Sequence, residues 1–94
     1  MTAYVIAQVS VSDPDGYSEY AGQTIALAEK FGGKFLVKGG ASEQIEGVGK
    51  DRNVLIEFAD TAAAKAFYYS EEYQAILPIA RRCSVRDLVI VEGV

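Results

Sequence analysis

The order of strand-like and helix-like segments constrains the fold of this chain more than any other feature. Four segments are rich in β-branched residues or alternate apolar and polar residues, as strands do. They cover residues 4–11, 34–38, 53–58 and 85–92. Apolar residues at helical spacing separate the first strand from the second and the third from the fourth. The order β-α-β-β-α-β predicts the ferredoxin-like fold of the α+β class, with a four-stranded antiparallel sheet.

Capping residues mark the ends of the predicted helices. Asp13 is a natural N-cap for the first helix, and Gly32 provides a left-handed stop at its C-terminal end. Asp60 or Thr61 caps the second helix, and Ser70 caps a third, shorter helix that continues it. The second helical region is therefore predicted to be split in two.

Three further stretches interrupt or connect these elements. Pro78 lies inside the last helix and removes a backbone hydrogen bond, which costs about 3 kcal/mol in a helix interior and predicts a kink or an early end. Residues 42–46 are predicted to form a short extra strand, and residues 47–52 an exposed loop. The EGVGKD sequence lacks the spacing of a phosphate-binding loop, and neither glycine pair around the second strand precedes a helix. These glycines are interpreted as chain-reversal points.

Composition limits the class of protein and its partners. The 94 residues suffice for one domain, residues 1–94, and half of them are hydrophobic, as in a globular protein. Thirteen acidic against nine basic residues give a net charge of -4, which disfavours nucleic acid and anionic membranes as partners. No segment has the apolar length to span a membrane or the basic start of a signal peptide. A cytoplasmic location is expected.

The chain contains no histidine and a single cysteine, Cys83. The lack of histidine removes the usual general base and the commonest metal ligand. One cysteine cannot form an intrachain disulfide, and Cys83 is interpreted as a small structural residue. We therefore expect neither a metal site nor a cofactor.

The strands are more apolar than a sheet with one solvated face requires. The predicted helix-facing layer consists of Val5, Ala7, Val9, Phe35, Val37, Val54, Ile56 and Phe58. The opposite face still holds Tyr4, Ile6, Leu36 and Leu55, and the last strand is apolar on both faces. Because the helices cover only one face, the sequence predicts a homodimer in which two sheets meet and bury about 1,200 Å² or more in total. The alternative is a monomer with a mildly apolar exposed face.

Five segments form an ordered set that spans nearly the whole chain. They are AYVIAQVSVSDPDGYSEY, GGKFLVKGG, VLIEF, AFYYSEEYQAI and LVIVEGV. In this order and spacing they resemble a bacterial family known as domain-of-unknown-function family 1330. The resemblance implies the dimeric α/β-barrel superfamily, which includes cofactor-free monooxygenases, lactone isomerases, haem proteins and proteins of no known activity, so the fold does not fix the function. The family often has arginine at Lys38 and tryptophan at Phe67, and lysine replaces a bidentate anion fork by a point charge.

Glu57 is a candidate for chemistry because it lies in the otherwise apolar strand VLIEF, on the face opposite the helices. An unpaired carboxylate there would be costly, so Glu57 is expected to pair or to accept hydrogen bonds. Lys38, at the end of the neighbouring strand, is predicted to share its face and to be its partner. The two are interpreted as a structural ion pair or, alternatively, as a small site in which Glu57 is a general base or anchors a ligand.

Tyrosines on the predicted helices form a second group of candidates. Such residues commonly belong to a core or an interface, with the hydroxyl reaching water. As a functional set, the tyrosines would line an aromatic pocket in which Ser70 and Tyr73 donate hydrogen bonds to a carbonyl or a phenol; the set is Tyr17, Tyr20, Tyr68, Tyr69 and Tyr73. Arg82 is interpreted with its neighbour Arg81 as a pair that suits a helix C-terminus, and it is also a candidate for binding an anionic ligand.

These features favour a cytoplasmic homodimer that binds a small organic molecule in a partly apolar cavity beside the sheet. The first alternative is a cofactor-independent isomerase or monooxygenase-like enzyme that uses Glu57 as its base. The second is a structural or stress-associated dimer without a ligand. The sequence leaves open whether the chain is an enzyme and what it binds.

Overall fold

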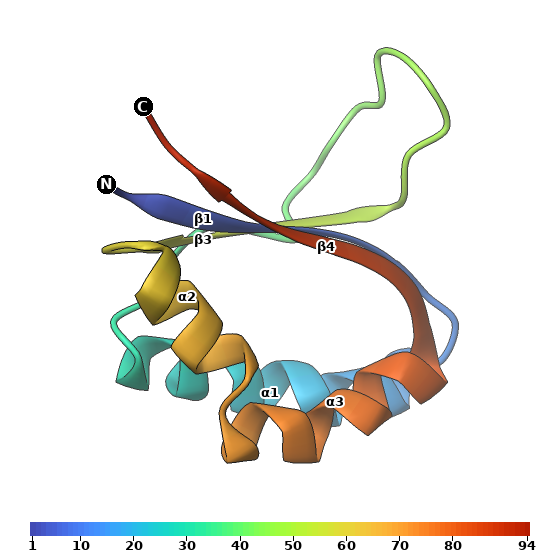
Figure 1. The fold of residues 1–94 in the computed structure, drawn as a ribbon. Helices are drawn as coiled ribbons and strands as arrows, with labels where there is room; N and C mark the ends of the chain where they lie inside the picture. The colour runs from blue at the N-terminus through green and yellow to red at the C-terminus, as the bar shows by residue number, and fades with distance from the viewer.

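All four strands pair in one antiparallel sheet, in the order β2-β3-β1-β4, in the computed structural model, which describes residues 1–94. The strands are β1 (Ala3–Val11), β2 (Lys34–Lys38), β3 (Arg52–Phe58) and β4 (Ser84–Glu92). The helices are α1 (Pro14–Lys30), α2 (Thr61–Tyr68) and α3 (Glu71–Cys83), and all three lie on one side of the sheet (Figure 1). This is the predicted ferredoxin-like topology with a split second helix. None of the helices is long and apolar enough to cross a membrane.

The helix caps lie where the sequence predicted them. The side chains of Asp13, Asp60 and Ser70 accept hydrogen bonds from backbone N–H groups in the first turns of α1, α2 and α3. After α1 the chain turns at Gly32, whose φ of 84° lies in the left-handed region that favours glycine. Local capping chemistry therefore fixes where all three helices begin and where α1 ends.

Pro78 does not end α3, which continues to Cys83. The predicted early end is therefore wrong. Pro78 and Gln74, whose carbonyl loses its helical partner, are both exposed, so water can satisfy that carbonyl. Buried residues before and after the proline, Leu77 and Ala80, keep the helix packed against the rest of the molecule. Tertiary packing thus outweighs the local cost of the proline.

Residues 42–46 form no strand, contrary to the prediction. The connection from β2 to β3 is irregular and projects from the side of the sheet that carries no helices (Figure 1). Gly47 and Gly49 adopt positive φ angles of 77° and 51°, which turn the chain away from an extended path. The predicted exposed loop is therefore longer than its sequence signal indicated.

The core lies between the helices and the sheet face that they cover, which we call the covered face. Alternate residues of β1, including Val5 and Val9, are buried there with Ile56 and Phe58 of β3. The ring of Phe67 in α2 stacks on Phe58, with 5.5 Å between the ring centroids. The predicted helix-facing layer is confirmed for these two strands.

A β-bulge changes the faces in β2. Phe35 pairs with Ile56, but Val37 pairs with Leu55, so one extra residue lies between the two pairs. Val37 therefore shares the face of Leu55, opposite to its prediction, and Lys38 pairs with Val54 on the covered face.

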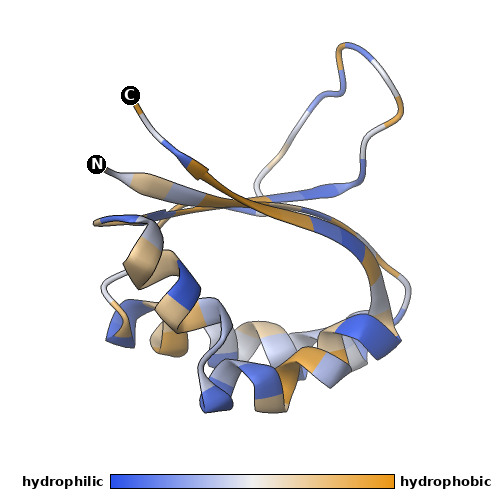
Figure 2. Cartoon of the chain, viewed as in Figure 1, coloured by the Kyte–Doolittle hydropathy of each residue, from blue (hydrophilic) through white to orange (hydrophobic).

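The other side of the sheet, which we call the uncovered face, leaves apolar side chains in contact with solvent. Ile6 is 39% exposed, and its pairing partner on β4, Val89, is 52% exposed. Val91 is 44% exposed, and Figure 2 shows hydrophobic residues along the C-terminal part of β4. The predicted apolar character of this face is therefore present in the single chain.

Candidate functional site

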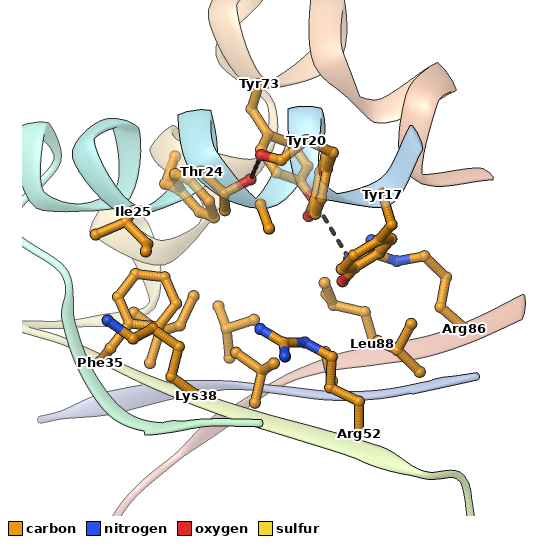
Figure 3. A pocket seen from close by; sticks show the side chains of 17 residues that line it. Tyr17, Tyr20, Thr24, Ile25, Phe35, Lys38, Arg52, Tyr73, Arg86 and Leu88 are labelled. Carbon is orange, nitrogen blue, oxygen red and sulfur yellow. Dashed lines mark hydrogen bonds between the residues drawn. The ribbon is translucent and has the colours of Figure 1, made fainter. Parts of the chain in front are cut away.

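A cavity lies between the covered face of the sheet and α1, and we call it the covered-face cavity (Figure 3). The space free of protein atoms is about 530 Å³ including its open side, and about 50 Å³ of it admits the centre of a water molecule. A single water needs about 10–15 Å³ by the second measure, so the cavity has room for a small molecule. Thirteen of its 17 lining residues are hydrophobic, and the other four are Thr24, Lys38, Arg52 and Arg86.

The strand register brings the two arginines to the same level of the covered face. Val9 of β1 pairs with Arg52 of β3 on one side and with Arg86 of β4 on the other. The three residues form one row across the sheet, with the two arginine Cα atoms about 10 Å apart at normal strand spacing. Val9 is buried between them. Both guanidinium groups therefore reach the cavity from the same end.

Gly39 makes room for Arg52. Its φ is 72°, and its N–H donates to the carbonyl of Asn53 at 2.9 Å, which closes the turn after β2. A Cβ at Gly39 would lie 2.1 Å from Nη1 of Arg52. The backbone conformation therefore favours glycine at this position, and a side chain here would displace the guanidinium.

Three tyrosines contribute the polar groups on the helix side of the cavity. The hydroxyls of Tyr20 in α1 and Tyr73 in α3 are 2.6 Å apart and share a buried hydrogen bond. Arg86 donates to the Tyr73 hydroxyl from Nη2 at 3.2 Å, and its guanidinium lies 5.1 Å from the centre of the Tyr20 ring. The guanidinium of Arg52 lies 5.8 Å from the ring centre of Tyr17. Each arginine thus stacks on one tyrosine of α1.

Burial and neighbouring groups shift the proton affinities at this end of the cavity. Burial, reinforced by Tyr20, raises the pKa of Tyr73 far above its ordinary value of 10.0. Burial also raises the pKa of Tyr17. Burial opposes the charged form of Arg86, but the Tyr20 and Tyr73 hydroxyls outweigh it, and the Arg86 pKa is raised. At neutral pH, Tyr17 and Tyr73 are therefore protonated beside a permanent cation.

Both arginines retain buried N–H groups without a hydrogen-bond partner. These are Nε of Arg52 and Nη1 of Arg86. Neither arginine forms a salt bridge. The two ion pairs of the chain join Lys30 to Glu72 and Lys50 to Asp87. A buried donor left unpaired lowers stability by about 1–3 kcal/mol. The cavity therefore contains unused hydrogen-bonding capacity next to positive charge.

The predicted site residues divide between the cavity and other places. Lys38, Tyr17 and Tyr73 line the cavity, and the ammonium of Lys38 lies 5.8 Å from the ring centre of Phe35. Ser70 is not among the lining residues, because its hydroxyl caps α3 by accepting from the N–H of Tyr73. Arg82 is exposed on α3 and also lies outside the cavity.

Glu57 lies on the uncovered face, where it pairs with Tyr4 of β1 and Lys34 of β2. The predicted partnership with Lys38 is wrong. The bulge in β2 places Lys38 opposite Val54, so the two side chains lie on different faces, and no ion pair joins them. Glu57 does not line the covered-face cavity, and its role as a base or ligand anchor stays a prediction for the other face.

Sequence analysis missed Arg52 and Arg86 as members of a site. Arg52 was assigned to the loop before the third strand, although it is the first residue of β3. Arg86 has the parity of Leu88 in the same strand, and this parity was a signal for the covered face. Tyr20 was included in the predicted aromatic set, but its bond to Tyr73 joins residues 53 positions apart and has no local signature.

Comparison with protein families places the whole chain in one of them. The model of the family described as "Domain of unknown function (DUF1330)" matches residues 2–94. The chain belongs to this family, as the sequence resemblance predicted. No curated protein shows significant sequence similarity to the chain.

Solved structures share the fold at low sequence identity. A protein of unknown function from Rhodopseudomonas palustris is 18% identical, with a TM-score of 0.75 over 99% of this chain and 82% of its own. A dimeric ferredoxin-like protein of unknown function from Jannaschia sp. CCS1 is 13% identical, with a TM-score of 0.74 over 99% and 100%. SnoaB, a cofactor-independent oxygenase from Streptomyces nogalater, is 12% identical, with a TM-score of 0.68 over 99% and 93%. The fold therefore occurs both in an oxygenase and in proteins without an assigned function.

Proposed function

We propose that this member of the DUF1330 family is a homodimer that binds a small organic molecule in the covered-face cavity of each chain. The cavity carries the proposal, because its walls are mostly apolar while a few polar groups converge at one end. This combination is typical of small-molecule sites. The guanidinium groups of Arg52 and Arg86 support it, since both belong to the lining and neither pairs with a carboxylate of the protein.

The homodimer rests on the uncovered face. Apolar side chains such as Ile6, Val89 and Val91 lie on it in the single chain, and no helix covers them. A two-fold contact between two such faces would bury them, and a specific dimer needs about 1,200 Å² or more in total. The Jannaschia protein with the same fold is described as dimeric, which supports the same assembly here. Sedimentation velocity at micromolar concentration should give the mass of two chains, and a monomer would contradict the proposal.

The ligand should be bound mainly by its apolar body. The hydroxyls of Tyr17 and Tyr73 act as donors or share existing bonds, because burial raises the pKa of both groups and keeps them protonated. Neither hydroxyl is suited to remove a proton from a substrate at neutral pH. Binding without turnover is therefore favoured over catalysis.

A cofactor-independent isomerase or monooxygenase-like enzyme is the second candidate. The shared fold of the Streptomyces nogalater oxygenase favours it, and the Tyr73 hydroxyl with Arg86 would stabilise a developing enolate. Such a reaction needs a base, and no carboxylate lines the cavity. Glu57 would serve only a site on the uncovered face. A structural or stress-associated dimer without ligand is the third candidate, and a filled cavity would argue against it.

A substitution that fills the cavity tests the binding function. Ala21 of α1 lines the cavity, so Ala21→Phe should occupy the space of a ligand. Ala26→Phe on the exposed side of the same helix is the matched control. In a ligand-observed NMR screen of small organic molecules, hits should bind to the wild type and to Ala26→Phe but lose binding to Ala21→Phe. Equal binding to all three proteins would contradict the proposed site.

Turnover separates the binder from the enzyme. Each hit should be incubated with the wild-type dimer in the presence of air and then analysed by mass spectrometry. An unchanged mass and an unchanged NMR spectrum support a binding protein. Conversion that disappears in Ala21→Phe but not in Ala26→Phe would instead assign an enzyme to the cavity.

A further inference from the structure

We infer that the ligand of the covered-face cavity is a small apolar carboxylate whose carboxyl group binds to Arg52 and Arg86. This inference rests on the proposed binding function and specifies the chemical class of the ligand. It depends on three observations, which are the charge of the lining, the position of the two guanidinium groups and the apolar character of the remaining walls.

All charged residues that line the cavity are cationic. They are Lys38, Arg52 and Arg86, and no Asp or Glu lines the cavity. The chain as a whole has the opposite bias, with thirteen acidic and nine basic residues. A partly buried cluster of like charges is unfavourable unless an anion offsets it. Because the protein provides no anion inside the cavity, an external one would be bound preferentially.

The two arginines leave donors for such an anion at one end of the cavity. They flank Val9 on the covered face, and Nε of Arg52 and Nη1 of Arg86 are buried without partners. In Figure 3 both guanidinium groups lie close to Tyr17, while Lys38 lies near Phe35. The planar fork of a guanidinium matches the two oxygens of a carboxylate. An anion between Arg52 and Arg86 would therefore meet two guanidinium groups that no carboxylate of the protein pairs with.

Stacking on tyrosine rings explains only part of this arrangement. Cation–π contacts with Tyr17 and Tyr20 account for the faces of the guanidinium groups of Arg52 and Arg86. They do not satisfy the N–H groups, which lie in the guanidinium plane. Stacking therefore leaves the edges of both guanidinium groups without a carboxylate partner, which a bound anion would supply.

The walls favour a carboxylate over a phosphate ester. Alanine, valine, leucine and aromatic side chains form most of the lining. Moving a doubly charged phosphate into such surroundings requires more desolvation than moving a single carboxylate. The limited free volume also restricts the apolar part to about the size of one ring or a short chain.

Matched probes of one shape and different charge test the inference. Benzoate, benzamide and benzylammonium should be titrated into the ¹⁵N-labelled wild-type protein and followed by amide chemical shifts. Benzoate should shift resonances of residues around Val9 and Arg52 and bind at least 10-fold more tightly than benzamide, while benzylammonium should not bind. Hexanoate and hexanamide should repeat the preference with a flexible apolar part.

Arginine substitutions locate the carboxylate. Arg52→Gln should weaken benzoate binding at least 10-fold and leave benzamide binding nearly unchanged, while Arg52→Lys should lose less. Arg82→Gln removes an exposed charge outside the cavity and is the control, with no change expected. Arg86→Gln should act like Arg52→Gln, and the dispersion of the amide spectrum identifies any variant that fails to fold.

The outcomes separate this inference from the proposed function. Equal binding of benzoate and benzamide at the cavity would overturn the carboxylate while leaving small-molecule binding intact. Benzoate binding that is insensitive to both Arg52→Gln and Arg86→Gln would also overturn it. If none of the anionic and neutral probes shifts the cavity resonances, both the inference and the proposed binding site are contradicted.

Discussion

The two faces of the sheet differ in what covers their side chains. On the covered face, Val5, Val9 and Phe58 are buried by the helices, and polar groups such as Arg52 and Arg86 reach a small cavity. On the uncovered face, Ile6 and Val89 remain partly exposed and no element of the same chain covers them. The first face therefore holds the fold together and contains a candidate site, while the second is available for assembly. Substitutions that affect the two faces separately test this division.

The largest effect on folding is expected at Phe67. Its ring is 1% exposed and contacts the rings of Phe58 and Tyr73, so Phe67→Ala should lower the free energy of unfolding by about 3–5 kcal/mol. Val91→Ala on the uncovered face is the comparison; in chains kept monomeric by Val89→Glu it should change the free energy of unfolding by less than about 1 kcal/mol. Urea denaturation measures both. Similar losses in the two variants would contradict the division of roles.

Assembly should depend on Val89 instead. Val89→Glu places a carboxylate in the proposed contact between two uncovered faces, where an unpaired buried charge costs about 3–5 kcal/mol. The dimer dissociation constant should therefore rise at least about 100-fold while the monomer stays folded. Ala26→Glu, on the exposed side of α1, carries the same charge change and should leave the dimer intact. Sedimentation equilibrium with circular dichroism decides the outcome, and a Val89→Glu protein that stays dimeric would contradict this contact.

Gly39 follows the edge strand β2 and lies against Arg52, which lines the cavity. Gly39→Ala forces a residue with a Cβ into a φ of 72° and against Arg52, so it should cost about 1–2 kcal/mol of stability. It should also weaken benzoate binding because Arg52 must move. Gly40→Ala is the matched control, since a Cβ there meets no atom within 4 Å. Equal stability and equal benzoate affinity of the two variants would show that Gly39 does not position Arg52.

The smallest expected effect is the loss of stability when the pH is raised from 9 to 11. The pKa of Tyr73 is raised in the folded protein, so the unfolded chain releases this proton near pH 10 while the folded chain keeps it. The contribution to stability is fully present below pH 10 and is lost as the pH rises toward the folded pKa, at up to about 1.4 kcal/mol per pH unit. Urea denaturation at pH 9, 10 and 11 should show this slope.

A phenylalanine substitution isolates this contribution. Tyr73→Phe should reduce the slope between pH 10 and pH 11, because no hydroxyl remains to titrate at that position. Tyr69→Phe removes an exposed hydroxyl and should leave the slope close to that of the wild type. If Tyr73→Phe keeps the full slope, the alkaline loss of stability arises elsewhere.

Local signals were sufficient for most of the fold. Asp13, Asp60 and Ser70 start helices because their side chains bond to the first free N–H groups, and this depends only on neighbouring residues. The alternation of side chains along β1 and β3 identified the covered face, because it too depends only on neighbouring residues. The early end predicted at Pro78 was wrong because the packing of α3 on both sides of it cannot be read from local propensity.

The sequence alone thus determined the element order and the apolar excess of the sheet, and it indicated Tyr17 and Tyr73, which line the cavity. Only the tertiary structure decided which charged side chains line the cavity together. The bulge in β2 moves Lys38 to the covered face, and the strand register places Arg52 and Arg86 on either side of Val9. The physical reason is that side chains alternate with a period of two, so one extra residue in a strand reverses the face of every residue after it. No local pattern in the chain records where that extra residue falls.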